Sequence, residues 1–160
     1  MPSDPIRVLL HVTELLERIG TPYFLGGSLA SSMLGEPRST VDIDLAIVLR
    51  SADVPALLAA LGPEFYVDEG AMRQAVERRS SFNAIHQPTV LKVDFFVLGD
   101  APFDRAQLEG RRLSPALEGS GRRVFVSSPE DLILRKLDWY RQGGGVSDRQ
   151  WRDVLGVLKV

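Results

Sequence analysis

The 160-residue chain contains no cysteine and only two histidines. Without cysteine the protein has no disulfide, no thiolate metal site and no cysteine nucleophile. The two histidines, His11 and His86, are too few for a histidine-rich zinc site. We expect His11 to be solvated and His86 to be structural or exposed.

The sequence also lacks a basic excess and a long apolar run. Its formal net charge of -2 argues against binding nucleic acid by bulk electrostatics. Arg73, Arg78 and Arg79 nevertheless form a local basic group, so tRNA is still a candidate partner. No apolar stretch approaches the ~20 residues of a membrane span, and the N-terminus lacks a secretory signal pattern. We therefore expect no membrane partner and a cytoplasmic location.

The length fits one domain. We expect a core over residues 1–126 and a helical extension of the same domain over 127–160. Hydrophobic periodicity predicts helices over residues 5–19, 28–34, 53–61, 69–79, 103–109, 128–141 and 147–160. It predicts strands over residues 23–25, 40–49, 65–67, 82–87, 90–98, 111–117 and 122–126.

Two carboxylates lie close together on one predicted strand. In the strand over residues 40–49, Asp42 and Asp44 project to the same side because side chains alternate between faces. Two neighbouring carboxylates repel unless a cation lies between them, and oxygen ligands suit Mg²⁺ or Mn²⁺. The alternative is a strand end at which both aspartates face water.

A glycine turn precedes that strand in the chain. Gly26 and Gly27 are followed by Ser28, where a short helix is predicted to begin. A helix N-terminus after glycines presents free N–H groups to an anion, and a serine adds a hydroxyl. This arrangement suits a phosphate, although an ordinary glycine turn with Ser28 as N-cap has the same sequence. A P-loop is excluded because its Lys-Ser/Thr pair is absent.

A third acid, Asp94, interrupts the strongly apolar strand over residues 90–98. Burying an unpaired carboxylate in such a strand would cost several kcal/mol. Asp94 is therefore expected either to face solvent at a strand end or to face a metal ion.

The pattern of Gly26-Gly27-Ser28, then Asp42-x-Asp44, then Asp94 resembles the nucleotidyltransferase superfamily that includes DNA polymerase β. Within it, the chain is similar to bacterial AbiEii-type toxin nucleotidyltransferases. The resemblance covers most of residues 22–158. It implies an α+β nucleotidyltransferase fold, with a mixed central β-sheet flanked by helices and a C-terminal helical pair.

The resemblance also implies an activity: transfer of a nucleoside monophosphate from an NTP such as ATP to an acceptor hydroxyl, with release of pyrophosphate. In this scheme Asp42 and Asp44 hold two Mg²⁺ or Mn²⁺ ions, and Asp94 completes the site of the ion that activates the acceptor. Gly27 and Ser28 bind the β- and γ-phosphates, and Gly26 belongs to the same nucleotide-binding turn.

Three further residues are candidates for nucleotide binding. Arg38 and Thr40 flank the expected metal site, where an arginine can contact phosphate, but Arg38 could equally be a surface residue. Lys136 lies on the apolar side of the helix predicted over 128–141, so it either extends its amine out of the core or points into a cleft. In the family a matching lysine meets the nucleotide.

The acceptor cannot be read from the sequence, and tRNA, a protein and a small molecule all stay open. A toxin–antitoxin setting, with an antitoxin-like or helical protein partner, is one context that the resemblance implies. The main alternative is a non-catalytic nucleotide-binding or antitoxin-like module that acts through a protein partner.

Overall fold

The computed structural model describes residues 4–26, 43–115, 117, 120–131, 133, 134 and 137. Within those ranges the helices are α1 (Asp4–Arg18), η1 (Ser51–Asp53), α3 (Val54–Leu61), η2 (Gly62–Glu64), α4 (Glu69–Arg78) and α5 (Pro102–Gly110). The strands are β1 (Tyr23–Gly26), β2 (Ile43–Ile47), β3 (Phe65–Val67), β4 (Ser81–His86), β5 (Leu91–Val97), β6 (Arg112–Leu113) and β7 (Phe125–Val126). Each strand overlaps the range that the sequence predicts for it.

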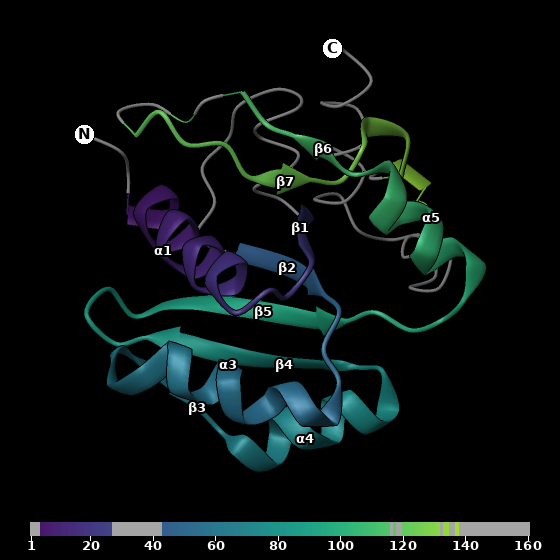
Figure 1. Cartoon of the computed structure of the whole chain (residues 1–160). Coiled ribbons are helices and arrows are strands. Elements are labelled where there is room, and N and C mark those ends of the chain that lie inside the picture. The colour runs from purple at the N-terminus through teal and green to yellow at the C-terminus, as the bar shows by residue number, and fades with distance from the viewer. Residues whose placement is uncertain are drawn as a thin grey trace.

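The described strands form one mixed sheet in the order β3-β4-β5-β2-β1-β7-β6 (Figure 1). β2 runs parallel to β5, and β1 runs parallel to β7. The other neighbouring pairs are antiparallel, including the predicted hairpin of β4 and β5. The expectation of an α+β protein with a mixed central sheet flanked by helices is confirmed.

One side of the sheet, which we call the covered face, carries the main core. Leu45 of β2 and Phe95 of β5 are completely buried there. They belong to one apolar cluster with Leu9 of α1, Leu57 of α3 and Met72 of α4. Burial of such a side chain contributes about 1.5–3 kcal/mol, so this cluster is the main source of stability.

The opposite side, which we call the open face, has a smaller apolar cluster. Phe24, Ala46 and Leu98 pack there with Leu108 of α5. Figure 1 shows α5 beside β6, apart from α1, α3 and α4. At the other edge of the sheet Tyr66 of β3 is 62% exposed. The open face is therefore covered around Phe24 and Ala46, and it is exposed at Tyr66 of β3.

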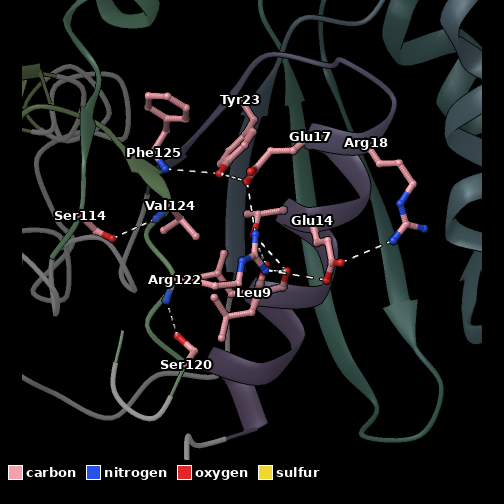
Figure 2. Close-up of polar contacts among 12 residues, drawn as sticks. Leu9, Glu14, Glu17, Arg18, Tyr23, Ser114, Ser120, Arg122, Val124 and Phe125 are labelled. Atoms are coloured by element: carbon pink, nitrogen blue, oxygen red, sulfur yellow. Dashed lines mark hydrogen bonds and ion pairs between the residues drawn. The ribbon is translucent and has the colours of Figure 1, made fainter. Parts of the chain in front are cut away.

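Hydrogen bonds and an ion pair connect β7, and the segment just before it, to α1 and β1 (Figure 2). Arg122 donates to the carbonyl oxygen of Leu10 over 2.7 Å, and its Nη2 lies 3.4 Å from Glu17 Oε2. The Tyr23 hydroxyl donates to the same Glu17 oxygen over 2.9 Å and accepts from the Phe125 N–H. Burial, with the hydrogen bond to Glu17, raises the pKa of Tyr23 to about 12. The hydroxyl therefore stays protonated at neutral pH and keeps its donor role.

β6 and β7 are shorter than the sequence predicts. Pro115 follows soon after β6 and has no N–H, so it interrupts the ladder, although the Leu117 N–H still donates to the Arg122 carbonyl oxygen over 2.8 Å. Two register pairs form, Arg112 with Val126 and Leu113 with Phe125.

The predicted start of the C-terminal helix is confirmed at Ser128. Its hydroxyl oxygen accepts a hydrogen bond from the Asp131 N–H over 3.1 Å, and residues 129–131, 133 and 134 are helical. The rest of the expected helical pair lies outside the described residues. No helix in the described ranges has the length and apolar character needed to cross a bilayer.

Candidate functional site

The polar centre of the open face is a row of residues that runs across four neighbouring strands. In the parallel pair of β2 and β5, Asp44 and Asp94 are direct Cα partners. Asp44 is also the partner of Gly26 on β1, and Asp94 that of Asn83 on β4. The strand register thus brings together Asp44 and Asp94, which are fifty positions apart in the chain.

Strand alternation directs this row to the open face. The neighbours Ile43, Leu45, Val93 and Phe95 belong to the core of the covered face. Because successive side chains of a strand point to opposite sides, Asp44 and Asp94 project away from that core. Both are partly exposed rather than buried.

The sequence left two possibilities for Asp94, a solvent-facing strand end or a metal-facing position. The structure places it in the middle of β5, with its side chain 24% exposed. Lys92, two residues earlier on the same strand, brings its Nζ within 3.7 Å of Asp94 Oδ1. The carboxylate therefore avoids the apolar core without lying at a strand end, and it has a cation beside it.

The two described carboxylates fit a hard divalent cation. Asp44 and Asp94 offer oxygen donors from adjacent strands on the same face, and such donors suit Mg²⁺ or Mn²⁺. No three His, Asp or Glu side chains gather as a metal-binding group in the described part of the chain, which does not include position 42. The described donors are thus a pair, and the third expected ligand lies outside the described residues.

Most of the other predicted site residues also lie outside the described ranges; these are Gly27, Ser28, Arg38, Thr40, Asp42 and Lys136. Gly26 is described and ends β1 directly beside Asp44. Among the described residues, none has an atom within 4 Å of a Cβ built at Gly26. The structure thus brings three predicted residues together: Gly26, Asp44 and Asp94.

A second polar cluster, which the sequence reasoning missed, joins α1 to the edge of the sheet. His11 Nε2 lies 2.7 Å from Glu64 Oε2, and His86 Nε2 lies 3.1 Å from Glu64 Oε1. His86 is buried and also bonds Thr89 through Nδ1 at 2.8 Å. The His11 ring stacks on Phe65 with centroids 5.8 Å apart. His11 is partly solvated, as expected, with its side chain 40% exposed, but it also pairs with Glu64 and stacks on Phe65. His86 is structural.

His11 and His86 contact the same carboxylate, that of Glu64. The hydrogen bond from His86, assisted by His11, lowers the pKa of Glu64 below its usual value of 4.5. The cluster belongs to the edge of the covered face, because His86 lies on the same face of β4 as the core residues Phe82 and Ala84. It is separate from the row of Asp44 and Asp94.

Solved structures with similar folds are nucleotidyltransferases. ANT(2'')-Ia in complex with adenylyl-2''-tobramycin is 19% identical over 98% of this chain and 89% of its own, with a TM-score of 0.63. The lincosamide antibiotic adenylyltransferase LnuA, lincomycin-bound, is 14% identical over 98% of this chain and 96% of its own, with a TM-score of 0.57. An antigenic nucleotidyltransferase-like protein from Paracoccidioides brasiliensis is 19% identical over 99% and 78%, with a TM-score of 0.64.

No protein-family model and no curated protein sequence matches the chain. At identities below 20%, the structural likeness establishes the fold. The chain has the nucleotidyltransferase fold, as expected from the sequence. The narrower resemblance to AbiEii-type toxins stays a prediction.

Proposed function

We propose that this chain is a Mg²⁺- or Mn²⁺-dependent nucleotidyltransferase that moves a nucleoside monophosphate from an NTP to an acceptor hydroxyl. The observation that carries the proposal is the pairing of Asp44 with Asp94 on the open face of a nucleotidyltransferase fold. Two carboxylates placed side by side contribute nothing to the core. They have a clear use if they hold cations that bind a triphosphate.

The acids of the chain have distinct proposed roles. Asp44, together with Asp42, holds the metal ions that bind the triphosphate, and Asp94 is a ligand on the acceptor side. When bound, the divalent ions supply charge stabilisation for both the attacking and the leaving oxygen. Because carboxylates provide all the protein ligands in this scheme, the absence of cysteine and the separate location of both histidines are compatible with it.

The nucleotide-binding part of the proposal follows the sequence pattern. The residues that we assign to the nucleotide are Gly26, Gly27, Ser28, Arg38, Thr40 and Lys136. Backbone N–H groups after the glycines would bind phosphate oxygens, and the two basic side chains would neutralise phosphate charge.

The proposed reaction is a displacement at the α-phosphorus. The acceptor oxygen forms a bond to the α-phosphorus, and the bond from that phosphorus to the oxygen bridging to the β-phosphate breaks. Pyrophosphate leaves with the electron pair of that bond, and the acceptor proton passes to Asp94 or to solvent. The products are an acceptor that carries a nucleoside monophosphate and free pyrophosphate.

For the acceptor we propose a hydroxyl-bearing small molecule as the first candidate. Two proteins of similar fold have structures with antibiotic ligands, adenylyl-2''-tobramycin in ANT(2'')-Ia and lincomycin in LnuA. The net charge of -2 also disfavours a long nucleic acid. Transfer to tRNA or to a protein, in a toxin–antitoxin setting with a helical partner, is the second candidate.

The position of a radioactive label distinguishes nucleotidyl transfer from other uses of an NTP. The protein is incubated with Mg²⁺ and each NTP, labelled at either the α- or the γ-phosphate, and with panels of aminoglycosides, lincosamides, tRNA and proteins. We expect the α-label on the acceptor and the γ-label in pyrophosphate. A γ-label on the acceptor would indicate phosphoryl transfer and contradict the proposal.

The alternative of a non-catalytic nucleotide-binding module gives a different result in the same samples. It predicts that ATP with Mg²⁺ binds in calorimetry while no acceptor in any panel gains the α-label. A protein that neither binds ATP with Mg²⁺ nor transfers the label would exclude both functions.

A further inference from the structure

Lys92 is a charged residue beside the row of Asp44 and Asp94, and the proposed function assigns it no role. Lys92 and Asp94 are two residues apart on β5 and therefore project to the same face. The Lys92 Nζ lies 3.7 Å from Asp94 Oδ1, and the lysine side chain is 49% exposed. The protein thus places its own cation next to a carboxylate that is proposed to bind a metal ion.

The local charges explain why a lysine is useful at this position. Asp44 and Asp94 are direct partners on adjacent strands, and two carboxylates at that separation repel each other. A nearby ammonium group offsets this repulsion when no divalent ion is bound. Because the lysine is half exposed and its stem is flexible, the ion pair is weak and can be displaced.

We propose that Lys92 is a built-in competitor for the cation site at Asp94. Its ammonium group occupies the Asp94 carboxylate in the metal-free protein and moves away when a divalent ion binds. This inference rests on the proposed function and assigns Lys92 a positioning and regulatory role at the same site. The lysine does not touch the reacting atoms.

The competition has a direct consequence for the order of binding. Lys92 lowers the affinity of the free protein for a divalent ion, since the ion must displace an ammonium group and then lies near it. An NTP brings additional oxygen ligands and negative charge, which outweigh the competition. Metal and nucleotide are therefore expected to bind mainly together, and the free protein stays largely metal-free.

The test measures metal binding directly, without reference to activity. Mn²⁺ is titrated into the protein without nucleotide, and free Mn²⁺ is followed by its electron paramagnetic resonance signal. We expect Lys92→Gln to bind Mn²⁺ about three- to tenfold more tightly than the wild type, as estimated for one charge several ångströms from a divalent ion in water. The difference should shrink at high salt because ions screen exposed charges.

Two matched variants separate this role from a general change in charge. Lys92→Arg keeps the cation and should bind Mn²⁺ as the wild type does. Arg18→Gln removes one positive charge from α1, whose apolar side packs on the covered face, and should also match the wild type. Thermal unfolding of each variant verifies that the fold is intact.

The outcomes distinguish the two proposals. If Mn²⁺ binds the wild type and Lys92→Gln with the same affinity, or binds the variant more weakly, the role of Lys92 is overturned while the proposed function stands. A repeat titration with a non-hydrolysable ATP analogue completes the test, with the analogue and Mn²⁺ without protein as the reference because the triphosphate itself binds Mn²⁺. If neither protein binds Mn²⁺ even with the analogue present, the proposed function fails, and the role of Lys92 fails with it.

Discussion

On the covered face of the sheet, β2 and β5 contribute Leu45 and Phe95, which are completely buried among the helices. On the open face the same two strands contribute Asp44 and Asp94, which are partly exposed, and Lys92 lies beside Asp94. The two sets of residues are adjacent in the chain but separated by the thickness of the sheet. One face is packed and apolar, and the other carries paired charges.

This difference shows how a short strand can serve stability and chemistry at once. Because the side-chain period of a strand is two, neighbouring residues have different surroundings. A substitution on the covered face should therefore change stability and leave activity nearly unchanged. A substitution on the open face should change activity and leave stability nearly unchanged. The following changes test that separation, from the largest expected effect to the smallest.

The largest effect on stability is expected at Phe95 of β5. Phe95→Ala removes a completely buried ring that stacks on Phe82, and it should lower the free energy of unfolding by about 3–5 kcal/mol. Urea denaturation followed by circular dichroism measures this change. The matched variant Asp94→Asn, one residue away on the open face, should stay within about 1 kcal/mol of the wild type. Equal losses in the two variants would contradict the separation of the faces.

A gain in stability is expected at the turn between β4 and β5, which sets the register that directs Asp94 to the open face. Val90 has a φ of 60° and is 77% exposed, a strained conformation for a β-branched residue. Val90→Asn should stabilise the fold by roughly 0.5–1 kcal/mol, because asparagine tolerates left-handed backbone. The control Val90→Thr keeps the β-branch and should show no gain in melting temperature. A loss of stability in Val90→Asn would show that the turn is not strained.

The smallest effect is a pH dependence at the edge of the covered face. The histidine contacts lower the pKa of Glu64 from 4.5 in the folded protein. A lowered pKa stabilises the fold above pH 4.5, and this contribution disappears as the pH falls through the folded-state value. Between pH 6 and pH 3 the melting temperature should fall slightly more for the wild type than for Glu64→Gln. Parallel curves would show that the cluster does not contribute to stability.

Much of the fold could be predicted from the sequence because its signals are local. Apolar residues at helical spacing predict α1, and alternation and a turn predict the hairpin of β4 and β5. Ser128 predicts the start of the helix expected over residues 128–141. The two acids Asp44 and Asp94 could be assigned to one site because the order of the glycine turn and the acids resembles that of nucleotidyltransferases. Their direct pairing across parallel strands could not be predicted, since register depends on long-range packing.

The missed contacts are those between segments distant in the chain. Glu64 meets His11 and His86 only after α1, η2 and β4 have packed together, and no local pattern indicates this. The bond from Arg122 to Leu10 spans 112 positions. The contact of Lys92 with Asp94 is different, because strand alternation alone places the two on one face. That pair could have been predicted.

The most direct test of the central claim compares α-label transfer by the wild type, Asp44→Asn, Asp94→Asn and Glu77→Gln. Glu77 is an exposed acid of α4, whose apolar side packs on the covered face, so it is the matched loss of a carboxylate. If the open face performs the chemistry, each aspartate variant loses at least about a hundredfold in rate while its unfolding is nearly unchanged, and Glu77→Gln keeps the wild-type rate. Wild-type rates in Asp44→Asn and Asp94→Asn would contradict the assignment of the active site to this row.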